Sequence, residues 1–152
     1  MATVYVADGD KELAEHEYKA ALGHDASDPM AQNNYGTYLF AEGKYKEAAE
    51  HLKVAAEDPK YVRRAQAYEN LGLTQLKLSA TADAEQSFLR ALMLNAVQPR
   101  SAFELAEIYF AAGDFVRSKQ YFDSYNTMAR PTSRSLWLGI RLSHVVGDQD
   151  QL

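Results

Sequence analysis

Cysteine is absent from the sequence of 152 residues. Disulfide bonds, zinc sites built from thiolates and a thiol nucleophile are therefore excluded. A chain without cysteine is compatible with the cytosol and with the periplasm, so this absence does not choose between a reducing and an oxidising compartment.

Concentrated positive charge and long apolar segments are also missing. The net charge is −5 with a pI near 5.3, and the one short basic cluster, Lys60 with Arg63 and Arg64, lies beside Glu57 and Asp58. We expect no nucleic-acid partner, because phosphate binding needs a concentrated basic face. The first residues carry neither the basic region of a signal peptide nor an apolar run long enough to span a bilayer.

Motifs that carry chemistry are missing as well. There is no glycine-rich phosphate loop, nucleophile elbow or metal-binding helix motif. The four histidines lie far apart in sequence, and solvated surface residues are the better interpretation even for His16 and His51, which fall in comparable helices. We therefore expect no catalytic residues, no metal and no cofactor, and we interpret the chain as a binding protein and not an enzyme.

The sequence does contain a repeat. Its apolar fraction of 47% is normal for a folded protein, and its length suits one domain or at most two small ones. Turn residues recur at steps of 34, 36, 34 and 34, each in a polar segment where glycine permits the left-handed backbone that ends a helix. The turn positions are Gly9, Gly43, Ser79, Gly113 and Gly147.

Further columns keep the same register. A small residue follows each turn position after five residues, a large apolar residue after nine, and usually alanine after twelve. These columns are Ala14, Ala48, Ala84 and Ser118; Tyr18, Leu52, Phe88 and Phe122; and Ala21, Ala55, Ala91 and Tyr125. Upstream of the turns a small residue follows an apolar one, in Tyr35-Gly36, Leu71-Gly72, Leu105-Ala106 and Leu138-Gly139.

These columns resemble the tetratricopeptide repeat. The resemblance implies an all-α solenoid, a right-handed superhelix of antiparallel helical hairpins. The physical reason for the small residues is that two antiparallel helices approach closely only where side chains are small. We expect glycine or alanine of the first helix to face alanine of the second, with the large residue filling the gap to the next hairpin. Tyr18, Tyr35 and Tyr125 fall in core columns, so core packing is the preferred interpretation for these tyrosines.

We expect a single repeat array over residues 1–152. It divides into a partial repeat at 1–28, full repeats at 29–64, 65–98 and 99–131, and a partial repeat at 132–152 whose helix covers 132–147. The 36-residue step predicts two extra residues in the loop at 58–64. Because the chain begins and ends within a hairpin, we expect it to belong to a longer array, since solenoids close with polar capping helices.

Stacked hairpins form a superhelix whose concave surface is lined by the first helix of each hairpin. The mixture of apolar and neutral polar residues predicted on this surface suits an extended peptide or a partner helix. The candidate partner-binding residues are Asn33, Thr37, Phe40, Gln66, Glu69, Asn70, Leu73, Lys77, Arg100, Phe103, Glu107, Phe110, Leu136 and Ile140.

Two asparagines have two competing interpretations. Asn34 and Asn70 occupy the sixth position of their repeats, where an amide either clamps a ligand backbone or caps local structure. A carboxylate clamp of the chaperone-docking type is disfavoured. Asn70 and Arg100 match that pattern, but the positions of Asn33, Thr37 and Glu104 do not.

Several strings resemble one subfamily. The most particular is Leu-Gly-Ile-Arg-Leu at 138–142, because a generic repeat does not require Arg141. With the Asn-Asn-Tyr-Gly string at 33–36 and the strings at 68–73, 117–122 and 134–142, it is similar to the type IV pilus biogenesis and stability proteins of Gram-negative bacteria, the PilF/PilW lipoproteins. The similarity runs from about Leu13 to Asp150.

That resemblance implies an outer-membrane lipoprotein on the periplasmic face that promotes localisation and multimerisation of the pilus secretin, as a pilotin does. The implied partner is the secretin or another pilus assembly protein. Membrane attachment is then implied only through an N-terminal lipid anchor, and the cysteine that would carry it is absent from this chain. The alternatives are a generic cytoplasmic peptide-binding adaptor or co-chaperone-like module, and a regulatory domain that tethers a catalytic neighbour.

Overall fold

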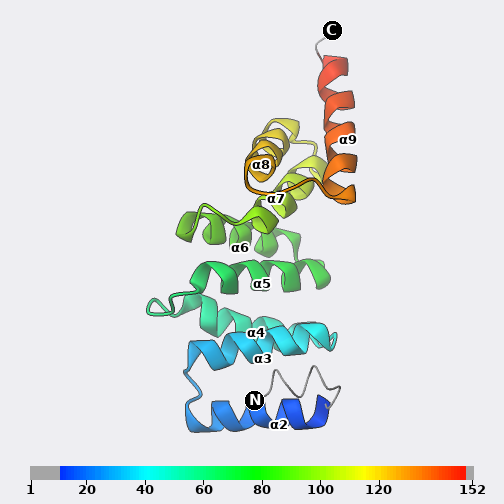
Figure 1. Cartoon of the computed structure of the whole chain (residues 1–152). Helices are drawn as coiled ribbons and strands as arrows, with labels where there is room; N and C mark the ends of the chain where they lie inside the picture. Colours follow the sequence, from blue (N-terminus) through cyan, green and yellow to red (C-terminus); the bar gives the residue numbers. More distant parts are fainter. Residues whose placement is uncertain (1–10, 150–152) are drawn as a thin grey trace.

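The computed structural model describes residues 11–149, which form a row of stacked α-helices (Figure 1). The helices are α2 (Lys11–His24), α3 (Pro29–Ala41), α4 (Tyr45–Glu57), α5 (Arg64–Lys77), α6 (Thr81–Leu94), α7 (Pro99–Ala111), α8 (Phe115–Met128) and α9 (Ser133–Gln149). The pairs α3–α4, α5–α6 and α7–α8 are antiparallel hairpins, which confirms the all-α repeat solenoid. We call α3, α5, α7 and α9 the A helices and α2, α4, α6 and α8 the B helices.

The solenoid curves toward its A helices. Each A helix contacts the next one along the row, as α3 does with α5 and α7 with α9. Among the described helices, no B helix contacts the following B helix. The A helices are therefore closer together and line the inner, concave side, as expected for stacked hairpins. No helix within residues 11–149 combines the length and the apolar character needed to cross a membrane.

The turns within the three hairpins form as predicted. The φ angle is +77° at Gly43 and Gly113 and +59° at Ser79. At the first turn the Lys44 N–H donates to the Leu39 carbonyl at 2.9 Å, which is the bond that defines a Schellman ending of a helix. The same bond closes the other two turns. The backbone at each turn therefore satisfies the carbonyls that the helix end leaves open.

The turn predicted at Gly147 is wrong, and the one at Gly9 lies outside the described residues. Helix α9 continues through Gly147 to Gln149, and Gly147 has no positive φ. The reason lies in the register, because Gly147 comes eight positions after Gly139 whereas Gly43 comes seven positions after Gly36. The glycine therefore misses the position at which a left-handed residue would end the helix.

The longest connection lies between the first two complete hairpins. It covers residues 58–63, two residues more than the connections at 25–28, 95–98 and 129–132, as the 36-residue step requires. Tyr61 in this loop is 9% exposed and joins the core cluster around Leu52. The Arg64 Nε donates to the Ala56 carbonyl at 3.0 Å. Packing and hydrogen bonding therefore fix the inserted residues on the end of α4.

Close helix approach within each hairpin depends on glycine. A Cβ added at Gly36 would lie 2.6 Å from Leu52, and one at Gly72 would lie 2.7 Å from the Phe88 ring. The expected approach to the small column occurs at Gly36, where the added Cβ would also lie 3.1 Å from the Ala48 carbonyl oxygen. The large B-helix residue of the same hairpin is closer still at both glycines, which the sequence did not predict. Leu52 also shares a core cluster with Leu71 of the next hairpin, so it fills the gap between hairpins as predicted.

Candidate functional site

A hollow of about 350 Å³, lined by amide and aromatic side chains, opens on the A-helix face between α3 and α5. It brings together four of the predicted partner-binding residues, which come from two successive repeats: Asn33, Thr37, Gln66 and Asn70. We call these four residues, with Asn34, the amide hollow. Tyr18, Tyr38, Ala41, Glu42 and Arg63 complete its lining.

Side-chain amides tie the two repeats together in this hollow. The Asn70 Nδ2 donates to Asn33 Oδ1 at 3.3 Å and lies 3.5 Å from Thr37 Oγ1. The Thr37 hydroxyl in turn donates to the Asn33 carbonyl at 2.8 Å. Asn70 therefore bridges neighbouring repeats, a role that neither of its two interpretations foresaw.

Two side-chain amides of the amide hollow make no hydrogen bonds within the described residues. Gln66 and Asn34 are exposed, and neither side-chain amide has a hydrogen-bond partner among residues 11–149. Each amide offers two donors and a carbonyl acceptor, a set that matches the alternating groups of an extended peptide backbone. Within the described residues, these two amides therefore have hydrogen-bonding groups that remain available.

Two further candidates, Phe40 and Leu73, pack mainly against the hydrophobic core. Phe40 is half-buried and packs edge-on against Tyr45 of the same hairpin, with ring centroids 5.4 Å apart. Leu73 packs against the core cluster that contains Phe88. Lys77 and Arg100 are exposed, but the structure does not bring them into the amide hollow.

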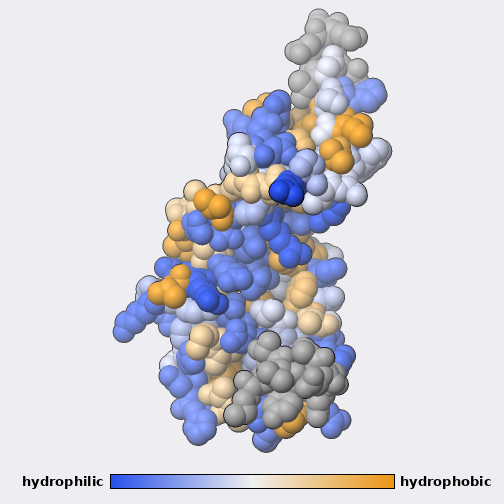
Figure 2. Space-filling view, in the orientation of Figure 1, coloured by the Kyte–Doolittle hydropathy of each residue, from blue (hydrophilic) through white to orange (hydrophobic). Residues whose placement is uncertain are grey.

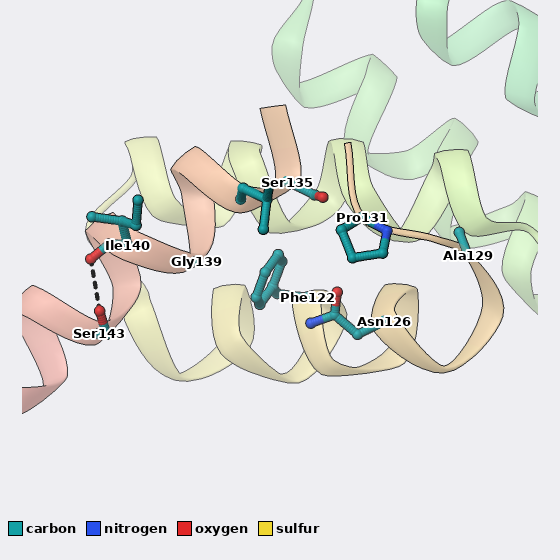
Figure 3. Close-up of a pocket in the computed structure, with 9 residues that line it drawn as sticks. Phe122, Asn126, Ala129, Pro131, Ser135, Gly139, Ile140 and Ser143 are labelled. Atoms are coloured by element: carbon teal, nitrogen blue, oxygen red, sulfur yellow. Dashed lines mark hydrogen bonds between the residues drawn. The ribbon is translucent and has the colours of Figure 1, made fainter. Parts of the chain in front are cut away.

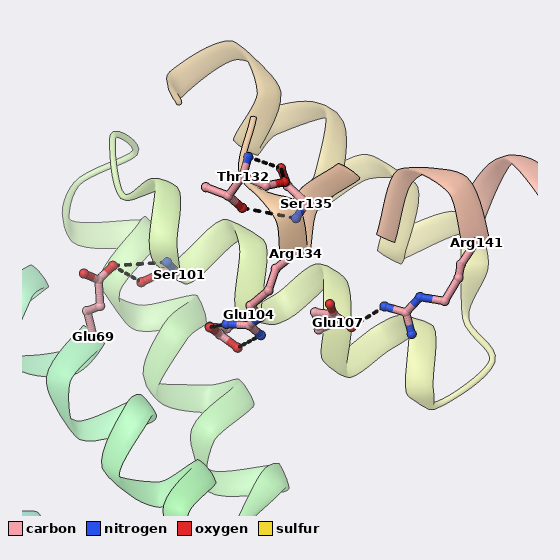
Figure 4. A network of polar contacts seen from close by, with 8 residues as sticks. All are labelled: Glu69, Ser101, Glu104, Glu107, Thr132, Arg134, Ser135 and Arg141. Atoms are coloured by element: carbon pink, nitrogen blue, oxygen red, sulfur yellow. Dashed lines mark hydrogen bonds and ion pairs between the residues drawn. The ribbon is translucent and has the colours of Figure 1, made fainter. Parts of the chain in front are cut away.

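Glu69 has a structural role that the sequence did not reveal. Its carboxylate accepts the Ser101 N–H at 3.1 Å and the Ser101 hydroxyl at 2.7 Å (Figure 4). Ser101 lies in the first turn of α7, where N–H groups lack helical partners and a negative charge is stabilising. Glu69 of one repeat therefore caps the A helix of the next.

Helix α9 packs over the middle of the predicted groove, where Phe103 is buried and Glu107 and Phe110 are half-buried, so that partner binding by these three residues stays a prediction. Arg141 donates to Glu107 at 2.8 Å (Figure 4). Its guanidinium lies 4.5 Å from the Phe110 ring centroid. The Arg141 Nε is buried and has no hydrogen-bond partner among the residues that the structure describes. Phe103 is 6% exposed because a second arginine, Arg134, covers its ring.

Arg134 also forms a two-pronged ion pair with Glu104. Its two terminal nitrogens lie 3.0 and 3.3 Å from the carboxylate oxygens, and the Glu104 carboxylate raises the pKa of Arg134. Glu104 is only 7% exposed. Glu104, the acidic residue that does not match the carboxylate-clamp pattern, is thus neutralised by an ion pair between α7 and α9.

Leu136 and Ile140 lie in a different environment from the amide hollow. They are 58% and 57% exposed and line an apolar groove of about 510 Å³ between α8 and α9. Phe122 points from α8 into this α8–α9 groove, beneath Gly139 (Figure 3). The space-filling view shows hydrophobic surface gathered on α9 (Figure 2). The predicted continuous strip therefore divides into the amide hollow, a middle over which α9 packs, and an apolar end.

His51 differs from the predicted solvated surface histidine. Its Nδ1 lies 2.6 Å from Gln32 Oε1, and its ring packs on Tyr35 with centroids 4.7 Å apart. Burial lowers the pKa of His51 below its ordinary value, because the charged ring would lose hydration. No group of three or more metal-binding side chains occurs in the described part of the chain.

Antiparallel hairpins, glycine-dependent A–B contacts and an inner face lined by A helices define the class of solenoid repeat proteins that present a binding surface to other proteins. The chain belongs to the tetratricopeptide repeat family, whose model matches residues 1–62 and 69–130.

Within that family the chain is similar to one characterised protein over nearly its whole length. It is 36% identical over 150 residues to the type IV pilus assembly protein PilF of Pseudomonas aeruginosa, covering 99% of this chain and 60% of PilF. A solved structure of Pseudomonas aeruginosa PilF has a TM-score of 0.93 at 36% identity and covers 98% of this chain and 67% of that one. The predicted resemblance to PilF is thereby confirmed.

More distant structures share the fold alone. MamA has a TM-score of 0.85 at 20% identity, covering 99% of this chain and 86% of that one. PilW, described as a widely conserved type IV pilus biogenesis factor, has a TM-score of 0.66 at 21% identity, covering 96% and 83%.

Proposed function

We propose that this chain is a protein-binding scaffold of type IV pilus biogenesis that promotes assembly and localisation of the pilus secretin in the outer membrane. The similarity to PilF supports the pathway. The observation that carries the binding role is the amide hollow, with its unpaired side-chain amides on the A-helix face.

The hollow favours an extended protein segment as ligand. Asn34 and Gln66 supply donors and acceptors to a backbone without demanding a particular side chain. Arg63 at the edge adds a positive charge, whereas the charge of nearby Glu42 is partly neutralised by Lys11 at 3.0 Å. A segment with backbone exposed and a modest negative charge therefore matches the hollow best.

This role places the protein at the periplasmic face of the outer membrane. The resemblance to pilotin lipoproteins supports attachment through an N-terminal lipid, carried by a cysteine that is not among these 152 residues. The secretin is the partner that the resemblance favours, and another pilus assembly protein would use the same hollow.

The experiment is complementation of a strain lacking the full-length gene, followed by a secretin blot of outer membranes without complete denaturation. The test variant is Gln66→Glu, which puts a negative charge into the amide hollow, where it repels a negatively charged segment and removes the donor of the amide. The matched control is Gln120→Glu, the same change at an exposed position of B helix α8. We choose Gln66 and not Leu73, because Leu73 packs against the core and a charge there would disturb the fold.

We expect the deletion to lose the secretin multimer while keeping the monomer, Gln66→Glu to reproduce that loss, and Gln120→Glu to restore the multimer. Normal multimers in the deletion strain would reject the secretin role. Normal multimers with Gln66→Glu, at wild-type protein level, would reject the hollow as the secretin-binding surface.

A further inference from the structure

Exposed apolar side chains gather on the edge of the solenoid where one hairpin joins the next. Val62, in the connection between α4 and α5, is 94% exposed. Met93, Leu94 and Val97, at the connection between α6 and α7, are 85%, 46% and 67% exposed. Both connections lie on the same side of the molecule (Figure 1), hydrophobic surface shows at both (Figure 2), and together they line one hollow of about 390 Å³. We call these four residues the apolar edge.

The apolar edge lies within the array, because a complete hairpin precedes and follows each of the two connections. The neighbouring hairpins are therefore in place and leave these side chains in solvent. The chain around Val62 is also fixed, since Tyr61 packs into the core and the Asp58 carboxylate accepts the Lys60 N–H at 2.8 Å. Val62 is thus held out in water by packed and hydrogen-bonded neighbours.

Cations flank the apolar edge. Lys60 and Arg63 lie on either side of Val62 in the one short basic cluster of a chain whose net charge is −5, and Arg100 follows Val97 by three residues. All three cations are exposed, and none of them forms an ion pair within residues 11–149. Apolar groups beside free cations match an anionic lipid surface, because the apolar groups enter the acyl boundary while the cations lie among the headgroup phosphates.

The two acids that precede the cluster are engaged within the fold. Glu57 lies 3.9 Å from the Lys53 ammonium, and Asp58 is held by the Lys60 N–H. Lipid is favoured over a protein partner by the shape of the edge. A side chain that is 94% exposed stands clear of the surface, and fluid lipid closes around such a group without needing a preformed pocket.

We propose that the apolar edge binds the surface of an anionic phospholipid membrane, with Val62 in the acyl boundary and Lys60 and Arg63 among the headgroups. The setting rests on the proposed function, which attaches the protein to a membrane through an N-terminal lipid. A second contact with the same membrane, made through this edge, would fix the orientation of the array on it.

Vesicle binding tests the charge part of the proposal. The purified chain is sedimented with phosphatidylcholine vesicles that contain or lack phosphatidylglycerol. The test variant is Lys60→Gln, and the matched control is Lys77→Gln, the same change at an exposed position at the other end of α5. We expect binding only to vesicles with phosphatidylglycerol, weakened about fivefold by Lys60→Gln and unchanged by Lys77→Gln.

A fluorescent label tests insertion of the apolar edge. Because the chain contains no cysteine, Val62→Cys and Val116→Cys each accept a single environment-sensitive nitrobenzoxadiazole label. Val116 is the control because it is 71% exposed on α8, away from the edge. We expect the emission at position 62, and not at position 116, to rise and shift to shorter wavelength on phosphatidylglycerol vesicles. Circular dichroism verifies that all variants fold.

Absence of vesicle binding at low salt, undiminished binding by Lys60→Gln, or equal label responses at both positions would overturn the proposal. A response of the label at position 62 to purified secretin, or to added unlabelled chain, without vesicles would also overturn it, because the edge would then belong to a protein interface. The vesicle experiments use the purified chain alone. Their failure therefore leaves the secretin role standing, and a failed secretin blot does not change the vesicle result.

Discussion

The close approach of α5 and α6 predicts a measurable cost for a side chain at Gly72. A Cβ there would lie 2.7 Å from the Phe88 ring, and Phe88 is 0% exposed, so the ring has no free space to move into. The further atoms of leucine overlap the ring more deeply, and we expect Gly72→Leu to cost about 3 kcal/mol, the upper end for overpacking. Leucine is favoured over glycine in a helix by about 0.8 kcal/mol, which leaves about 2 kcal/mol of net destabilisation.

Thermal unfolding followed by far-ultraviolet circular dichroism measures this effect. For a chain of this size about 2 kcal/mol corresponds to a Tm lower by about 4–8 °C. The control is Gly23→Ala in α2, where an added Cβ meets no atom within 4 Å. That variant should gain about 0.5–1 kcal/mol from helix propensity. An unchanged or raised Tm for Gly72→Leu would refute the assigned register and the argument from close approach.

Three further predictions concern single residues. Ser79→Gly should raise the free energy of unfolding by about 0.5–1 kcal/mol, measured by urea unfolding. Relief of the strain that serine has in the left-handed backbone at φ +59° outweighs the extra conformational entropy that glycine gives the unfolded chain, and a destabilised variant would contradict this. Arg134→Ala should destabilise by about 1–3 kcal/mol by leaving the Glu104 carboxylate buried without its partner, and adding Glu104→Gln should recover part of the loss. The pKa of His51 is lower in the folded chain than in the unfolded chain, so the unfolded chain takes up a proton first as the pH falls. The contribution of neutral His51 to stability is therefore present above about pH 6.5 and is lost as the pH falls through the folded pKa. Urea midpoints from pH 7 down to pH 5 should therefore fall less steeply for His51→Gln.

Features set by local pattern were predictable from the sequence. The turns at Gly43 and Gly113 and the small column at Gly36 and Gly72 follow from residue type and spacing alone. Gly147 shows the limit, because a single residue of register moved the glycine away from the place where it could end the helix.

The candidate site was less predictable, because it depends on contacts between repeats. Arg134 and Glu104 are 30 residues apart, and Arg141 and Glu107 are 34 apart. A repeat pattern predicts which face a residue occupies but not whether the next helix carries a long side chain that covers it. The unusual arginine in the Leu-Gly-Ile-Arg-Leu string was the one signal in the sequence that α9 would cover part of the groove.

The bridge between Asn70 and Asn33 links recognition to the shape of the whole solenoid. In a solenoid each hairpin contacts only its neighbours, so the array can bend at each interface between hairpins. The spacing of successive A helices, such as α3 and α5, relates to the local curvature. The Asn70–Asn33 side-chain hydrogen bond of 3.3 Å is a direct link between these two helices across the amide hollow. A ligand that takes over the Asn70 amide would release this tie, so that binding and bending become one event.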